Sequence, residues 1–289
     1  MSAATPADPA TNPAHPRLLL LGIGTAAGVY SGLFGVGGGS VMVPLLILLL
    51  AYDPRVATAT SLAAITVIAT AGTITHAIYG NVAWRVAAVV AVPAIVGAVV
   101  GTSLQQRVPR AWISIGLALL LIVGAIDLLR PLLASVETAL TGWEIHNSYS
   151  SAPDLTSVSQ PVVLGIAGFL AGMLGGMVGI GGGILIVPVL LYTQDFGERE
   201  AIATSLAAMV PMSIAAAARH HHYGNLRVKE GLTLGVLGIA GAAVGASIAE
   251  IAPEAVLRLG FAVLMLLIAA QMLRGVRRER RAATPGPTT

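Results

Sequence analysis

Long stretches without a charged residue dominate this sequence. By residue number they are 18–52, 56–84, 86–106, 155–194, 201–218 and 231–249. Each reaches the ~18 residues that mark a membrane-spanning helix. Only 10% of the chain is charged, whereas a soluble domain carries roughly 25% charged residues. We therefore expect a polytopic membrane protein.

Glycine and aromatic content favour helices over a β-barrel. The chain has 34 glycines, and only 4% of its residues are aromatic. Small residues let membrane helices pack backbone to backbone, whereas outer-membrane barrels carry girdles of aromatic side chains. The predicted fold class is all-α.

The chain ends and the absence of cysteine argue against a signal peptide, a nucleic-acid-binding protein and a protein held by disulfides or thiolate metal sites. Residues 1–16 have no basic segment before an apolar core, so we expect a disordered tail and not a signal peptide. A basic cluster after the last apolar run is typical of a cytoplasmic anchor and not of nucleic-acid binding. Its members are Arg274, Arg277, Arg278, Arg280 and Arg281. Without cysteine, disulfides and thiolate metal sites are excluded.

The sequence repeats itself at a constant offset of 144 residues. Gly35 and Gly179 begin two equivalent glycine-rich segments, since 179 − 35 = 144. A gap-free match that extends over most of each half indicates a duplication. Matching pairs include Gly37 and Gly181, Gly38 and Gly182, Gly39 and Gly183, Pro44 and Pro188, Thr60 and Thr204, Ser61 and Ser205, His76 and His220, and Asn81 and Asn225.

The duplication predicts two membrane repeats, residues 17–130 and 161–274. An extracytoplasmic linker, 131–160, separates them, and a basic cytoplasmic tail, 275–289, follows them. In each repeat we expect a glycine-broken helical hairpin and three transmembrane helices. The three helices are expected at 56–79, 86–106 and 111–130, and again at 201–223, 231–249 and 255–273.

The first apolar stretch, 18–52, is too long for one straight span. As one helix it would measure ~50 Å, against a hydrocarbon core of ~30 Å. It is either a single span interrupted at the glycines, which gives parallel repeats, or a hairpin, which gives inverted repeats. With the basic C-terminus inside, the hairpin keeps Arg107 and Arg110 cytoplasmic, whereas the interrupted span places them outside. The charges favour inverted repeats, with both termini cytoplasmic, as in many secondary transporters.

Three doubled motifs resemble one known family. They are Gly-x-Gly-Gly-Gly-x-x-x-x-Pro, Ala-x-x-Thr-Ser-Leu and a His/Tyr-Gly-Asn segment, in the same order in both repeats. Together they resemble the sulfite exporter TauE/SafE family of membrane permeases, over roughly residues 20–275. The resemblance implies transport of sulfite, sulfonates or related organosulfur anions across the bacterial inner membrane. The second copy departs from the first, because Gly-Asn-Val-x-Trp becomes Gly-Asn-Leu-Arg-Val.

The two glycine breaks are the first candidates for substrate binding. A helix that starts after glycines presents unpaired N–H groups and a positive dipole end to an anion. The alternative is that these glycines serve only close packing, the role we assign to Gly97 and Gly101 and to Gly241 and Gly245. The predicted anion-binding glycines are Gly37, Gly38, Gly39, Gly181, Gly182 and Gly183.

Polar residues repeated in both halves extend the candidate site. They are Thr60, Ser61, His76, Asn81, Thr204, Ser205, His220 and Asn225. Each has an alternative role: hydroxyls in membrane helices bond back to the preceding turn, asparagines cap helix ends, and histidines make interfacial hydrogen bonds or carry a coupled proton. Consecutive histidines on a helix point about 100° apart, so His220, His221 and His222 predict no metal site.

These features favour a secondary transporter, in which an anion binds near the bilayer midplane. No cofactor motif or nucleophile–base pair is evident, so we expect neither an enzyme nor a cofactor. The candidate partners are the anion, the lipid bilayer, a coupling proton and a second copy of the chain. A passive anion channel and a non-transporting membrane subunit are the alternatives. Substrate, coupling ion, direction and oligomeric state stay open.

Reporter fusions test the predicted topology. Reporters placed after Arg281 and after Pro109 are expected to read cytoplasmic, and one inserted between residues 135 and 155 is expected to read external, because basic residues flank only the first two positions closely. Alkaline phosphatase and fluorescent-protein fusions make the measurement. A cytoplasmic reading from the linker would contradict inverted repeats.

Overall fold

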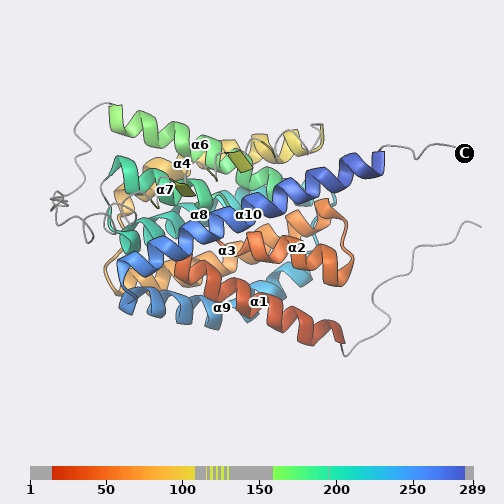
Figure 1. The fold of residues 1–289 in the computed structure, drawn as a ribbon, viewed down its shortest axis with the longest axis horizontal. Helices are drawn as coiled ribbons and strands as arrows, with labels where there is room; N and C mark the ends of the chain where they lie inside the picture. Colours follow the sequence, from red (N-terminus) through yellow and green to blue (C-terminus); the bar gives the residue numbers. More distant parts are fainter. Residues whose placement is uncertain are drawn as a thin grey trace, which may run out of the picture.

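The computed structural model describes residues 15–107, 159–194 and 196–283, and isolated positions between 115 and 129. Every regular element in the continuous ranges is an α-helix (Figure 1). The helices are α1 (His15–Phe34), α2 (Gly39–Leu50), α3 (Pro54–Ile78), α4 (Trp84–Gln105), α6 (Ser159–Val178), α7 (Gly183–Thr193), α8 (Glu198–His222), α9 (Val228–Ile251) and α10 (Glu254–Ala283). The all-α class is confirmed.

Six helices in the described ranges are long and apolar enough to cross a membrane. They are Pro54–Ile78, Trp84–Gln105, Pro161–Val178, Glu198–His222, Val228–Ile251 and Ala255–Gly275. Large apolar side chains cover their outer faces: Val92 on α4 is 65% exposed and Val236 on α9 is 59% exposed. Such surfaces suit contact with lipid chains, and the polytopic membrane class is confirmed.

Helix boundaries differ from the expected ones mainly at the predicted tails and the predicted linker. Helix α1 begins at His15, inside the expected tail, and α6 begins at Ser159, inside the expected linker. Helix α10 continues through the arginine cluster to Ala283, because arginine, glutamate and alanine are strong helix formers. The helix expected at 111–130 lies outside the continuously described residues.

Each glycine break turns the chain back on itself. Gly38, which precedes α2, has a φ of 73°, and Gly182, which precedes α7, has a φ of 76°, a region that side chains disfavour. Gly38 packs against Ala27, well inside α1, and Gly182 packs in the same way against Ala171 of α6. The short helices α2 and α7 therefore return alongside α1 and α6 (Figure 1). The apolar stretches form hairpins and not single interrupted spans.

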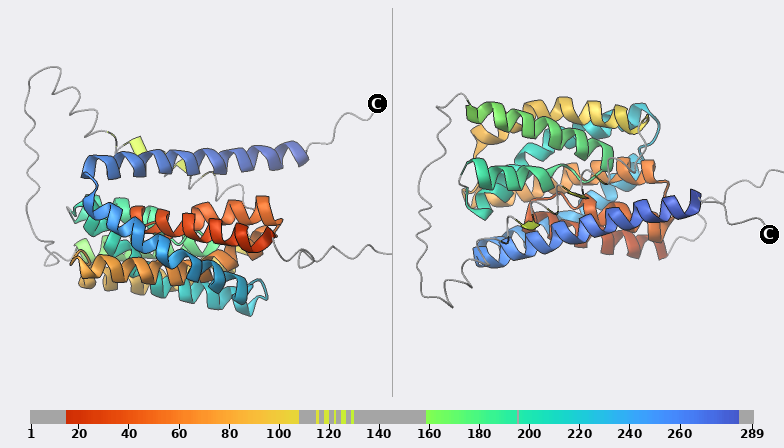
Figure 2. Two further views of the ribbon diagram at one scale, coloured as in Figure 1. Left: turned by 90° about the horizontal axis from the view of Figure 1, so that it is seen from below. Right: turned by 45° about the horizontal axis from the view of Figure 1, so that its top comes forward.

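The two halves interleave. Helix α1 of the first half packs against α9 of the second, and α6 of the second half packs against α4 of the first. Helices α3 and α8 contact each other between these pairs, and α10 runs along one side of the bundle (Figure 2). Each half therefore completes its packing with a helix of the other.

Helices α1 and α6 run in opposite directions along the bundle (Figure 1). The start of α1 and the end of α10 lie at the same end of the molecule. How these directions relate to the two sides of a bilayer stays a prediction.

Small residues let α4 approach α6 closely, and α9 approach α1 closely. A methyl group added at Gly101 would overlap the carbonyl oxygen of Met173 on α6, and one added at Gly245 would overlap that of Val29 on α1. A methyl group added at Gly97 would overlap backbone atoms of α6, and one added at Gly241 would overlap backbone atoms of α1. The packing role predicted for these four glycines is confirmed.

Replacing Gly101 with alanine is expected to lower the thermal unfolding midpoint of the purified protein. The added methyl group has no room, and overpacking costs about 1–3 kcal/mol. Gly22→Ala on α1 is the matched control, because nothing lies within 4 Å of its new methyl group. Equal midpoints for the two variants would show that the α4–α6 approach is not as close as described.

Candidate functional site

The two glycine breaks meet inside the bundle. A methyl group at Gly39 would overlap the carbonyl oxygen of Gly179, and one at Gly183 would overlap that of Gly35. Each contact joins the start of a short helix in one half to the break of the other half. All four glycines are buried. The structure thus brings together the residues that the sequence predicts as the anion-binding glycines.

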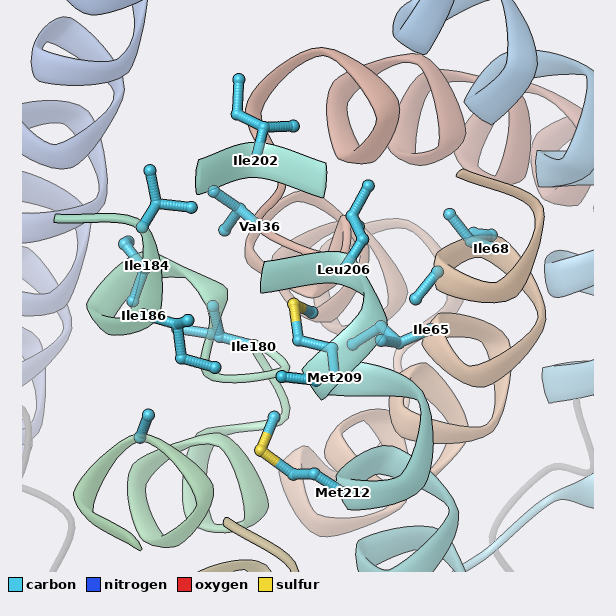
Figure 3. Packing of buried hydrophobic residues seen from close by; sticks show 14 of the residues in the cluster. Val36, Ile65, Ile68, Ile180, Ile184, Ile186, Ile202, Leu206, Met209 and Met212 are labelled. Carbon is cyan, nitrogen blue, oxygen red and sulfur yellow. The ribbon is translucent and has the colours of Figure 1, made fainter. Parts of the chain in front are cut away.

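Two equivalent apolar side chains fill the junction between the breaks. Met209 lies against Gly37, Gly181 and Gly183, and Ile65, its counterpart 144 residues earlier, lies against Gly37 and Gly39. Figure 3 shows Met209 between Ile65 and Ile180. Both side chains are fully buried. The junction is therefore shielded from water on the side of α3 and α8, a feature that the sequence analysis did not predict.

Helices α1 and α6 end inside the bundle, where their last carbonyl groups need donors other than water. The Nε2–H of His76 donates to the carbonyl oxygen of Gly32 at 3.1 Å, and that of His220 donates to Gly176 at 3.2 Å. Both rings are fully buried within the bundle. Neither Nδ1 atom has a hydrogen-bond partner among the described residues.

The two repeated serines donate across the halves. The hydroxyl of Ser61 on α3 lies 2.9 Å from the carbonyl oxygen of Gly179, and that of Ser205 on α8 lies 3.0 Å from that of Gly35. Ser61 also reaches the carbonyl oxygen of Thr58, so its one proton is shared. Each serine thus fixes the first glycine of the opposite break.

The remaining predicted residues lie away from the breaks. Thr204 accepts a hydrogen bond from the backbone N–H of Ala83, just before α4, whereas the hydroxyl of Thr60 has no partner in the described part of the chain. The backbone N–H groups of Asn81 and Asn225 bond to the carbonyl oxygens of the histidines five residues earlier, which is the capping pattern after a left-handed glycine. The Asn81 side chain donates to Glu250.

The first amide groups of α2 and α7 come directly after the two breaks. Backbone bonding in α2 begins with the N–H groups of Val41 and Met42, which both donate to Gly38. The same pattern in α7 begins at Leu185. The amides before these positions are the free donors of a helix N-terminus and carry its positive dipole end. They could bind an anion without a lysine or arginine nearby.

Charged side chains gather near the helix ends. Burial and the hydrogen bond to Glu230 raise the pKa of Tyr52, between α2 and α3, to about 12, so this phenol stays protonated at neutral pH. At the start of α8, the buried Glu198 forms an ion pair with Arg258 of α10. The sequence analysis missed this pair, because the two residues are far apart in the chain. No cluster that could hold a metal occurs in the described ranges.

The sequence profile described as sulfite exporter TauE/SafE matches residues 2–128 and 164–289. The chain belongs to the sulfite exporter TauE/SafE family. It is therefore a multi-pass membrane transporter, and the resemblance carried by the doubled motifs is confirmed. No solved structure matches the chain.

Similar proteins in this family carry the general description of probable membrane transporter. One from Xylella fastidiosa (strain Temecula1) is 31% identical over 193 residues, which is 66% of this chain and 69% of the relative. YdhB of Bacillus subtilis is 30% identical over 231 residues, covering 80% and 89%. YunE of the same organism is 26% identical over 264 residues, covering 89% and 97%.

Replacing Ser205 with alanine is expected to lower the free energy of unfolding by about 1–3 kcal/mol, because the buried carbonyl of Gly35 loses its donor. Thermal or denaturant unfolding of the purified protein measures the change. Thr70→Val is the control, since its hydroxyl bonds within α3 at an exposed position, and we expect its effect to stay within about 0.5 kcal/mol. A Ser205→Ala variant as stable as the control would contradict the cross-repeat bond.

Proposed function

We propose that the protein is a secondary transporter, an exporter of sulfite, sulfonates or related organosulfur anions, and that the anion binds where the two glycine breaks meet. The observation that carries this proposal is the contact of Gly39 with Gly179 and of Gly183 with Gly35. It places the N-termini of α2 and α7 in one region, one from each half. The family described as sulfite exporter supports the substrate class.

Backbone donors suit a transported anion. A buried lysine or arginine would bind the anion more tightly and slow its release, whereas amide groups replace part of its hydration shell without a full opposing charge. No lysine or arginine lies among the described residues of the two breaks, Gly35–Gly39 and Gly179–Gly183. Binding by the glycine amides therefore allows both capture and release.

The interleaved halves support alternating access with inverted repeats. Helices α1 and α6 run in opposite directions, as in transporters whose repeats face opposite sides of the membrane. We infer that the inner membrane holds the bundle with both termini cytoplasmic. Small movements of one hairpin against α3 and α8 would then expose the junction to one side at a time. In this scheme Ser61 and Ser205 hold the breaks together between these movements.

The two buried histidines are the proposed carriers of a coupled proton. Each uses Nε2–H to satisfy a helix end and leaves Nδ1 without a partner among the described residues. A proton at Nδ1 would add a positive charge close to the breaks when the anion is present. Histidine has this capacity because its ordinary pKa is near 6.5.

Adding a methyl group at Gly182 is expected to abolish most sulfite transport. Gly182→Ala strains a left-handed residue and directs the methyl group at Ala171. Gly224→Ala is the matched control, because it has a similar φ of 71° but open space around it. The two variants are compared by measuring saturable sulfite flux into proteoliposomes.

Both variants must first be shown to be monodisperse and inserted. A folded Gly182→Ala protein that transports sulfite at the wild-type rate would show that the anion does not bind at the breaks. A flux that rises linearly with concentration, without saturation, would favour a passive channel over a carrier.

Replacing His76 or His220 with glutamine is expected to flatten the pH dependence of transport between pH 5 and 8. Glutamine keeps a donor for the helix-end carbonyl but cannot take up a proton in this range. Sulfite itself titrates near neutrality, so a sulfonate, which stays ionised, is the transported probe. An unchanged pH profile in both variants would leave the histidines only their structural role.

A further inference from the structure

The two breaks differ in one respect that the repeat does not explain. The first half carries three hydroxyl groups around its break, from Tyr30, Ser31 and Ser40. The counterparts 144 residues later are Leu174, Gly175 and Ile184, which have no polar side-chain atom. The first break therefore has hydroxyl groups in the flanking helices at positions where the second break has none.

The three hydroxyl-bearing residues lie in the last two turns of α1 or the first turn of α2, the two helices that flank the break. Ser40 lies in the first turn of α2, and the Tyr30 hydroxyl lies near that of Ser40. Ser31 lies one helical turn after Ala27, the α1 residue against which Gly38 packs. In the second half, a Cβ atom at the equivalent position of Ser31 would lie 2.8 Å from the backbone nitrogen of Gly182. From the internal repeat we infer that Ser31 lies beside the start of α2.

Ser31 has no hydrogen-bond partner among the described residues, and the hydroxyls of Tyr30 and Ser40 have no partner there other than each other. Ser31 is 0% exposed and Ser40 is 7% exposed. Buried polar groups are nearly always paired, since an unpaired one destabilises the fold. Apolar residues at the equivalent positions of the second half show that the architecture does not require hydroxyls here. Their presence points to a ligand.

We propose that Tyr30, Ser31 and Ser40, with the first amides of α2, bind one –SO3 group of the transported anion. The inference rests on the proposed function and makes the site asymmetric, because α7 contributes amides but no equivalent hydroxyls. Three hydroxyl donors match the three oxygens of sulfite or of a sulfonate, whereas a carboxylate offers only two. The anion therefore binds closer to α2 than to α7.

The test combines ligand-induced thermal stabilisation with transport kinetics on the variant Ser31→Ala/Ser40→Ala. Without ligand, its unfolding midpoint is expected to equal that of the wild type, because Ser31 has no partner among the described residues and Ser40 has none there except the Tyr30 hydroxyl. With sulfite or methanesulfonate, the stabilisation seen for the wild type is expected to disappear. The KM for sulfite transport is expected to rise by about tenfold or more, which is the loss of two ordinary hydrogen bonds.

Thr73→Val is the matched control, because its buried hydroxyl already donates to the carbonyl of Ala69 on its own helix. It should change the KM less than twofold. A lower midpoint of the double variant without ligand would show that the hydroxyls are structural and would overturn the proposal. Tyr30→Phe, which keeps the ring contact with Phe34, tests the third hydroxyl and should also weaken sulfite binding.

The outcomes distinguish a failure of the proposed hydroxyl site from a failure of the proposed transport function. If wild-type protein is neither stabilised by sulfite nor able to transport it saturably, the proposed function itself fails. If the wild type does both and the double variant keeps both, the function stands and the hydroxyl site is wrong. If acetate stabilises the wild type as strongly as sulfite and methanesulfonate, the match to a –SO3 group is wrong.

Discussion

Backbone groups at helix ends inside the membrane are the constraint on which this structure depends. Helices α1 and α6 stop within the bundle, and no water in a hydrocarbon core could satisfy their last carbonyl groups. Histidine and serine side chains take that role: His76 and His220 cap their own hairpins, and Ser61 and Ser205 bond to the opposite ones. The residues that repeat most clearly in the sequence are therefore those that close the broken helices.

The N-terminal ends of the short helices α2 and α7 carry amide groups that have no partner within their own helix. Carbonyl groups at the ends of α1 and α6 find donors within the chain, whereas the first amides of α2 and α7 precede the first backbone hydrogen bonds of their helices. The fold therefore leaves free amide donors at the starts of α2 and α7, beside the junction of the two halves. An excess of donors suits an anionic substrate and follows from the direction in which the chain turns at the glycines.

The duplication and the membrane class could be predicted from the sequence because both depend on simple patterns. Apolar stretches and a fixed offset of 144 residues predicted most helix boundaries closely. The hairpin at Gly35–Gly39 followed from the length of the apolar stretch together with the charges near Arg107. The cross-repeat role of Ser205 could not be predicted, since a hydroxyl in a helix gives no signal about its partner.

Other features depend on three-dimensional packing and had no pattern in the sequence. Met209 and Ile65 are ordinary apolar residues in helices, and only the fold places them between the breaks. The ion pair of Glu198 and Arg258 joins residues that are 60 positions apart. The hydroxyls of Tyr30, Ser31 and Ser40 stand out only when the two halves are compared position by position, because the signal is a difference between the repeats.

The position of a bound anion tests the central claim most directly. A cryo-electron microscopy reconstruction of the full chain in lipid nanodiscs at saturating sulfite would locate it. The account predicts density for one anion between the two breaks, within hydrogen-bonding distance of the first amides of α2. Anion density at the Glu198–Arg258 pair, with the junction of Gly39 and Gly179 unchanged, would contradict the claim that the glycine breaks form the substrate site.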